Sequence, residues 1–213
     1  MPYPILQLPY GLQRRLRGLA TPKERYNLQV AIGFDKNYLS PLQMHNNNPK
    51  YFENQLWNTS ELLFITTDVD LHYGCTNDDL FVFERNLKII NFEEFDFDKP
   101  WFDHFVINCE SFGIGGGIMN SACLKKLSKL CDSKRITDLS LRDCTPDVSL
   151  CLIFESFSNL ETISLHSPNY ESNWIQDILS CKKLDLIGLE IESRFEKLFC
   201  FEPHELSLLY KVS

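Results

Sequence analysis

The most regular pattern of apolar residues lies in the C-terminal half of the chain. Three segments share the pattern L-x-x-L-x-L, in which alternate residues are apolar, and each predicts one β-strand with one buried face. The three segments are Ile136-x-x-Leu139-x-Leu141, Leu160-x-x-Ile163-x-Leu165 and Leu184-x-x-Ile187-x-Leu189. Their first positions, 136, 160 and 184, are 24 residues apart each time. Equal spacing of this kind predicts repeated strand–helix units that stack on one another.

The segments between these strands have helical character. Residues 148–157 and 173–179 are compatible with helices, and a looser unit precedes them. Its strand is expected at 105–109 and its helix at 121–130, capped by Asn120 or Ser121, with the glycine-rich stretch 113–117 as a loop between them. The simpler alternative is three amphipathic strands that are spaced by chance in an ordinary α/β domain.

The middle of the chain predicts a boundary followed by β-structure. Residues 41–60 are rich in Asn and Pro, which favour loops, so we expect a linker there. Residues 63–67 predict a strand, and residues 81–83 and 87–90 are candidates for a hairpin.

Residues 4–32 predict a compact pair of helices. Leu12, Leu16 and Leu19 are spaced by four and three, so they share one helix face. The second helix is expected to begin with Thr21 as its N-cap, Pro22 in the first turn, and Glu24 three residues after the cap.

The net charge also changes near residue 40, where the linker is expected to begin. Residues 1–40 carry six basic and two acidic side chains, a net charge of +4; because the whole chain carries −8, the remainder carries −12. This acidic balance argues against nucleic acid and anionic membranes as partners, since both need clustered Lys and Arg. A basic first segment on an acidic protein indicates two units with different partners, or a solvated helix face.

The eight cysteines contain no C-x-x-C pair, and several lie among apolar residues. We therefore expect all eight to be free and to behave as small apolar side chains, as in the reducing cytoplasm or nucleus. No apolar stretch approaches the roughly 20 residues of a membrane span, and residues 1–8 lack the charged and apolar regions of a signal peptide, so we expect neither.

The first forty residues resemble a divergent F-box. The resemblance is carried by a Leu-Pro pair, a leucine ten residues beyond the proline, and a Pro-Lys-Asp-like turn, here Leu8-Pro9, Leu19 and Pro22-Lys23-Glu24. The L-x-x-L-x-L units behind it resemble leucine-rich repeats. The order of the two is similar to that of F-box/leucine-rich-repeat proteins, including the rapidly diversified F-box-like families of nematodes.

The resemblance implies an α+β fold, with an N-terminal helical F-box-like hairpin followed by a short leucine-rich-repeat-like α/β solenoid. The implied divisions are residues 1–40, a linker at 41–60, and a repeat domain at 61–213 whose clearest repeats span 136–200. It also implies an adaptor that joins an unknown protein substrate to a Skp-type linker protein of a cullin ubiquitin ligase. The residues implied to contact the linker protein are Leu8, Pro9, Leu12, Leu16 and Leu19.

The positions between the repeat leucines are expected to face the target protein. They are Asp138, Ser140, Arg142, Thr162, Ser164, His166, Leu186, Gly188 and Glu190. A rival function is a leucine-rich-repeat binding or inhibitory protein with a degenerate F-box, which is favoured by Arg15 at a usually apolar position and by the absence of the closing Trp.

Catalytic chemistry is not indicated. Gly113 and Gly115 fit the start of G-x-G-x-x-G, but Ile118 takes the place of the third glycine, and no Gly-Lys-Ser/Thr follows. The five histidines form no metal-binding motif, and no G-x-S-x-G is present. We therefore expect no catalytic residue, no metal and no cofactor. A nucleotide-dependent enzyme that uses the glycine stretch is the weakest alternative.

Overall fold

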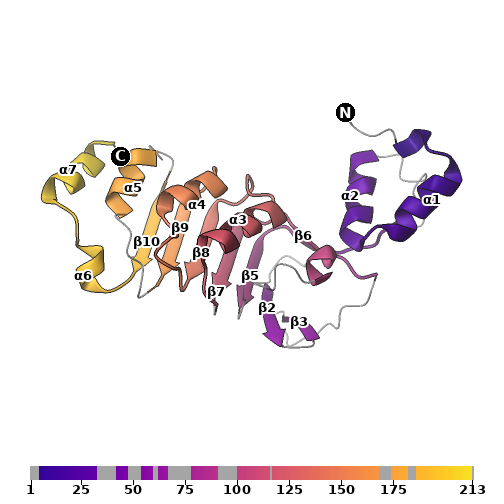
Figure 1. The fold of residues 1–213 in the computed structure, drawn as a ribbon, viewed down its shortest axis with the longest axis horizontal. Coiled ribbons are helices and arrows are strands. Elements are labelled where there is room, and N and C mark those ends of the chain that lie inside the picture. The colour runs from indigo at the N-terminus through magenta and orange to yellow at the C-terminus, as the bar shows by residue number, and fades with distance from the viewer. Residues whose placement is uncertain are drawn as a thin grey trace.

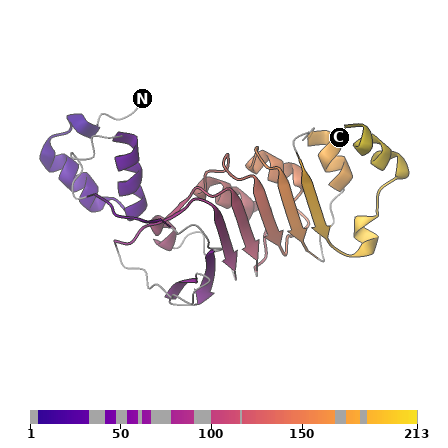
Figure 2. The same cartoon turned by 180° about the vertical axis from the view of Figure 1, so that it is seen from behind.

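Figure 1 shows the computed structural model, an elongated mixture of helices and parallel strands. It describes residues 5–32, 42–47, 54–59, 62–66, 78–90, 100–115, 117–167, 174–181 and 186–212. Two N-terminal helices lie at one end, and a long sheet extends from them with helices along one of its faces. Seen from behind, the same sheet turns its other face toward the viewer (Figure 2).

The main sheet has seven strands in the order β10-β9-β8-β7-β5-β2-β3. All neighbouring pairs are parallel except β2 and β3, which are antiparallel. The strands are β2 (Asn54–Thr59), β3 (Leu62–Thr66), β5 (Asn86–Ile90), β7 (Ser111–Gly115), β8 (Asp138–Arg142), β9 (Thr162–His166) and β10 (Gly188–Glu192). The region expected as a linker, 41–60, thus contributes β2 to the sheet.

A second, parallel sheet contains β1 (Asn46–Asn47), β4 (Phe81–Phe83) and β6 (Phe105–Ile107). After β4 and after β6 the chain bends and enters the main sheet as β5 and β7. Neighbouring bends are joined where Asn108 N–H donates to Phe83 O at 2.9 Å and Ser111 N–H donates to Arg85 O at 2.9 Å. The expected hairpin of 81–83 with 87–90 is therefore wrong, because β4 and β5 belong to different sheets.

The α-helices come either before β1 or after β7 along the chain. They are α1 (Tyr10–Leu19), α2 (Pro22–Ile32), α3 (Ser121–Leu130), α4 (Leu150–Ser156), α5 (Trp174–Cys181), α6 (Phe195–Leu198) and α7 (Pro203–Val212), with short 3-10 helices at Ile5–Gln7 and Pro100–His104. Asn120 caps α3 as predicted, since its side chain accepts from Cys123 N–H at 2.8 Å. Ser149 caps α4 in the same way.

The core lies between the sheet and helices α3 to α5. The strands alternate as predicted for β8 and β9, where Leu139, Leu141, Ile163 and Leu165 are at most 2% exposed. Helices α3, α4 and α5 supply buried partners from the same face of the sheet. These helices thus cover one face of the sheet with buried apolar side chains.

The third unit lies two residues later than the even spacing predicts. Leu189 pairs with Ile163, and Ile191 pairs with Leu165, so the inward positions are 186, 189 and 191. Ile187, expected to point inward, is 81% exposed. The step from Leu160 to Leu186 is therefore 26 residues, and a search for an equal period selected the wrong register.

Residues 113–115 of the glycine-rich stretch lie in a strand and not in a loop. Gly113 and Gly115 lie in β7, which pairs with β5 and β8, whereas the strand expected at 105–109 belongs to the second sheet. A Cβ atom at Gly115 would lie 3.2 Å from Cδ of Arg142, and one at Gly113 would lie 3.4 Å from Cγ of Lys88. Glycine is used here because two long neighbouring side chains cross the strand.

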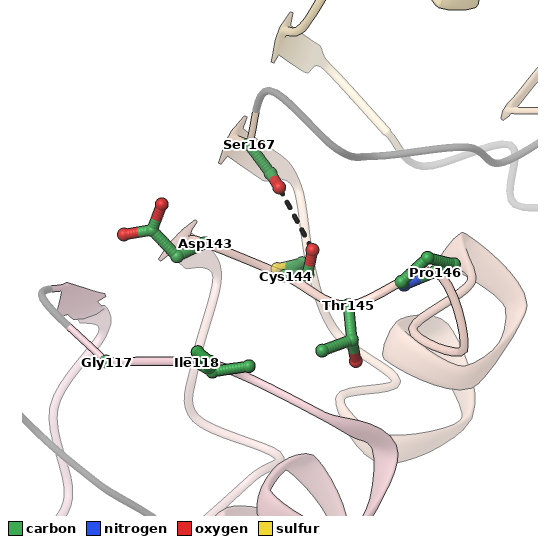
Figure 3. A pocket seen from close by; sticks show the side chains of 7 residues that line it. All are labelled: Gly117, Ile118, Asp143, Cys144, Thr145, Pro146 and Ser167. Atoms are coloured by element: carbon green, nitrogen blue, oxygen red, sulfur yellow. Dashed lines mark hydrogen bonds between the residues drawn. The ribbon is translucent and has the colours of Figure 1, made fainter.

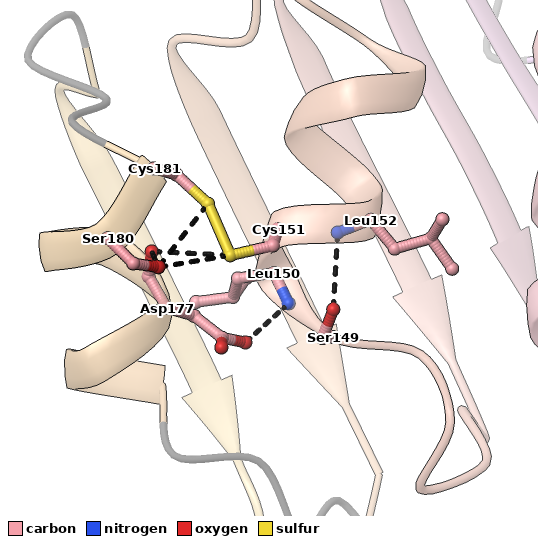
Figure 4. The surroundings of a disulfide bond; sticks show 7 residues. All are labelled: Ser149, Leu150, Cys151, Leu152, Asp177, Ser180 and Cys181. Atoms are coloured by element: carbon pink, nitrogen blue, oxygen red, sulfur yellow. Dashed lines mark hydrogen bonds between the residues drawn. A yellow bond between two sulfur atoms is a disulfide. The ribbon is translucent and has the colours of Figure 1, made fainter.

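The expectation of eight free cysteines is wrong for one pair. A disulfide joins Cys151 on α4 to Cys181 on α5, with a Cα–Cα distance of 6.0 Å (Figure 4). Neighbouring units place α4 and α5 side by side, which brings the two residues into the normal disulfide range. Cys109, Cys123, Cys131, Cys144 and Cys200 are free.

A membrane-spanning segment was not expected from the sequence. Within the part of the chain that the structure describes, no helix combines the length and apolar character needed to cross a bilayer.

Candidate interaction surfaces

Helix α1 turns its apolar residues toward solvent. The exposed fractions are 75% for Tyr10, 50% for Leu12, 37% for Leu16 and 77% for Leu19, while Pro9 is exposed and Leu8 is half-buried. Four of the five residues expected to contact a linker protein are therefore accessible. Apolar side chains that gather on one exposed helix face are typical of a surface that another protein covers.

The buried side of the same helix is polar. Gln13 is only 8% exposed, and its Nε2 donates to Leu8 O at 2.8 Å. Arg17 is half-buried; burial, and then the positive charge of Arg25, lower its pKa. On α2, Gln29 is 7% exposed, and its Nε2 has no hydrogen-bond partner among the described residues. The polarity of α1 is thus the reverse of that of an ordinary surface helix.

The start of α2 has the predicted capping box. Thr21 Oγ1 accepts from Glu24 N–H at 3.3 Å, and the Glu24 carboxylate accepts from Thr21 N–H at 2.9 Å. The pair satisfies two backbone donors that a helix N-terminus leaves free.

Polar contacts attach α2 to the sheets. Arg25 forms an ion pair with Asp78 at 2.9 Å, and its Nε donates to Oε1 of the buried Gln43 at 2.7 Å. Gln43 in turn donates to Asp78 O at 2.7 Å. Tyr26 packs against the apolar cluster of Leu80, Val82 and Val106.

A second attachment lies at the end of α3. Lys23 Nζ donates to Leu130 O at 3.3 Å, in the last turn of α3, where a positive charge complements the helix dipole. Burial lowers the pKa of Lys23, and the nearby Asp103 partly opposes this shift. The helix pair is therefore fixed to the sheets by several side chains.

The uncovered face of the main sheet contains most of the residues expected to face a target. Paired residues in neighbouring strands point to the same face, so the register defines rows across it. One row is Lys88, Gly113, Ser140, Ser164 and Glu190, and the next contains Arg142, His166 and Glu192, with Gly115 beside Arg142. Asp138, Thr162 and Gly188 lie in a further row with Ser111 and Asn86.

Leu186 was wrongly assigned to this face. It precedes β10 and packs against the core, as the shifted register requires. Sequence reasoning missed Glu192, Lys88 and the two glycines of β7, because it placed the third unit two residues early and treated β7 as a loop.

Side-chain pairs cross the sheet face. Nδ1 of His166 lies 2.7 Å from the Glu192 carboxylate, and Ser164 Oγ donates to the Glu190 carboxylate at 3.0 Å. Acidic side chains therefore gather on β10, while Lys88 and Arg142 give the central strands basic side chains.

The buried thiols are unsuited to nucleophilic chemistry. Desolvation raises the pKa of Cys109, Cys131 and Cys144 to about 12, and reactive cysteines instead need a lowered pKa. Among the described residues, no group of His, Cys, Asp and Glu could hold a metal ion. The His72 region, considered for metal binding from the sequence, lies outside the described residues.

Comparison with known proteins found no relative of this chain. Neither a protein-family profile nor a curated protein nor a solved structure matches the chain.

Proposed function

We propose that the chain is a non-catalytic adaptor, the substrate-recognition subunit of a Skp–cullin–F-box type ubiquitin ligase. In this proposal the N-terminal helices are a divergent F-box that binds a Skp-type linker protein. The uncovered sheet face binds a protein substrate that is then marked for ubiquitin-dependent degradation.

The outward apolar face of α1 carries the proposal. A leucine stripe normally packs into a protein's own core, which was the simpler explanation for Leu12, Leu16 and Leu19. These leucines are instead 37–77% exposed, while Gln13 and Gln29 occupy buried positions. Covering the three leucines with a partner would bury apolar surface at roughly 25 cal/mol per Å².

The charge of the helix pair supports an acidic partner. Arg14 and Arg15 are exposed on α1 beside the leucines, and residues 1–40 carry a net charge of +4. The Skp-type linker implied by the F-box resemblance is acidic. Complementary charge would mainly raise the association rate.

The sheet is proposed to be a short leucine-rich-repeat-like solenoid. Units at 112–114, 139–141, 163–165 and 189–191 share one register, and a helix follows each of the first three strands on the same face. Repeat proteins use the face left uncovered for recognition. Attachment of α2 through Lys23 and Arg25 would hold the substrate at a fixed position relative to the ligase.

The second candidate is a repeat protein that binds or inhibits a target without recruiting a ligase. Arg15, which is exposed in the middle of α1, favours this candidate because it places a charge where an F-box usually has an apolar residue. Both candidates use the sheet face, and they differ only in what covers α1.

Binding of purified chain to a purified Skp-type linker protein tests the proposal. We expect the wild type to retain the linker in a pull-down and Leu12→Asp to lose it, since a carboxylate in an apolar contact is strongly disfavoured. Leu208→Asp is the matched control, because Leu208 on α7 is 45% exposed against 50% for Leu12. If the wild type does not retain the linker, the ligase function fails and the second candidate stands.

A further inference from the structure

A cavity of about 370 Å³ opens where β7, β8 and β9 end (Figure 3). Its lining comes from the segments that follow these strands, residues 117–118, 143–146 and 167. The carboxyl ends of parallel strands all meet at one edge of a sheet, which is where open α/β sheets bind ligands. Its volume falls within the range of sites that enclose a small group.

Most of the cavity wall is apolar. Ile118 is 68% exposed, and Pro146 is exposed on the opposite side. The hydroxyl groups of the lining are already used, since Ser167 Oγ donates to Cys144 O at 3.0 Å and Thr145 Oγ1 donates to the Asp147 carboxylate, with Met119 O at 3.2 Å as the alternative acceptor. The Cys144 thiol is buried and remains neutral, because desolvation raises its pKa to about 12.

Among the described residues that line the cavity, Asp143 has the one charged side chain. Its φ is 54°, a left-handed conformation that few residues other than Gly, Asn and Asp adopt. Its N–H donates to His166 O at 2.9 Å and its O accepts from Met119 N–H at 3.1 Å, which fixes the backbone. Figure 3 shows the carboxylate pointing away from the bond between Ser167 and Cys144.

The charges around the cavity favour a cation. Asp143 is exposed and forms no ion pair with any described residue. The stem of the neighbouring Arg142 instead crosses Gly115 on the sheet face. The Glu192 carboxylate is not part of the cavity lining, because it contacts Nδ1 of His166 on the sheet face, although the Glu192 backbone oxygen accepts from Ser167 N–H at 2.9 Å.

We propose that this cavity binds a lysine or arginine side chain of the target protein. The apolar stem of the side chain lies between Ile118 and Pro146, and its cationic end pairs with the Asp143 carboxylate. Lys and Arg are the residues that combine a long apolar stem with a charged end. The proposal rests on the recognition function proposed above and names one feature of the protein recognised.

The test is an NMR titration of the full chain with N-acetyl-arginine amide and N-acetyl-lysine amide. We expect saturable shifts of the backbone amides of Ile118, Asp143, Thr145 and Ser167, with a dissociation constant on the order of a few millimolar. N-acetyl-norleucine amide, which has the stem without the charge, should bind at least about fivefold more weakly.

Asp143→Asn is the decisive variant. Asparagine tolerates the left-handed backbone and nearly preserves the shape, so the fold should be retained while the affinity for both cationic probes falls at least about fivefold. Equal binding of the norleucine probe, equal binding by the variant, or no saturable shift at these amides would each overturn the proposal.

The result separates this proposal from the ligase function. Linker binding uses α1, so Asp143→Asn should retain the linker fully in the pull-down. A wild type that binds the cationic probes without binding the linker contradicts only the ligase function. A wild type that binds the linker without binding the probes contradicts only the proposed cavity site.

Discussion

Ile163 and His166 lie on the same strand, β9, and point to opposite faces of the sheet. Ile163 is fully buried, whereas His166 contacts Glu192 on the uncovered face. We expect Ile163→Ala to lower the free energy of unfolding by about 2–4 kcal/mol, because it leaves a cavity in a packed core. His166→Ala should change it by at most about 0.5 kcal/mol, since surface contacts of this kind contribute little. Urea denaturation measures both, and the reverse order would mean that the two faces are wrongly assigned.

The hydrogen bonds of Asp147 should make the stability of the sheet and its helices depend on pH. Its carboxylate accepts from the Thr145 hydroxyl and from Ser121 N–H at the start of α3, and these hydrogen bonds lower its pKa from 3.8 to about 2. Because the folded pKa is the lower one, the carboxylate stabilises the fold above its unfolded pKa, and this contribution is lost as the pH falls toward 2.

We therefore expect the wild type to lose more stability than Asp147→Asn between about pH 5 and pH 2. Chemical denaturation at several pH values within that range measures the difference. Glu155→Gln, which removes an exposed carboxylate from α4, is the control and should follow the wild type. Parallel curves for the wild type and Asp147→Asn would contradict the assigned hydrogen bonds.

At the scale of elements, the disulfide links the helices of two successive units. It joins residues 30 apart in sequence, and a cross-link over such a loop typically stabilises by about 2–4 kcal/mol. We expect Cys181→Ser to lower the free energy of unfolding by this amount under non-reducing conditions. Cys200→Ser, at an exposed free cysteine, should have little effect.

Alkylation measures the same bond directly. Without reduction, a reagent added in denaturant should leave Cys151 and Cys181 unmodified, and the mass should show both modified after reduction. Modification of both before reduction would contradict the disulfide.

The sequence predicted those elements whose residues alternate cleanly. The alternating pattern of β8 and β9 was sufficient to predict both strands and their buried faces, because every second residue is apolar and buried. It misplaced β10, since a two-residue insertion is invisible to a search for equal spacing. It missed β7, because glycines that make room for Lys88 and Arg142 are indistinguishable in sequence from loop glycines.

At the scale of the whole molecule, Arg25 and Gln43 help to hold the N-terminal helices against the sheets. Arg25→Ala would leave Oε1 of the buried Gln43 without its donor, so we expect it to lower the free energy of unfolding by about 1–3 kcal/mol. Arg14→Ala, at an exposed arginine of α1, should remain within about 0.5 kcal/mol of the wild type. Equal effects in thermal and urea denaturation would mean that this contact does not stabilise the attachment.

The exposed face of α1 and the cavity beside Asp143 were predictable from the sequence to different degrees. The sequence identified the leucines of α1, but an apolar helix stripe can face either the protein's own core or a partner. Only the packing of α1 shows that Gln13 is buried while Leu12 and Leu19 are exposed. The cavity beside Asp143 had no sequence signal, because its walls come from three segments that the register of separate strands brings together.

The central claim is that the exposed face of α1 binds a Skp-type linker protein. Isothermal titration of the purified linker into the wild type, Leu12→Asp and Leu208→Asp tests it most directly, with circular dichroism of each sample as the check on folding. We predict saturable binding by the wild type and by Leu208→Asp, and a loss of at least about tenfold in affinity, or 1.4 kcal/mol, for a folded Leu12→Asp. Unaltered affinity of Leu12→Asp, or no heat of binding for the wild type, would contradict the claim.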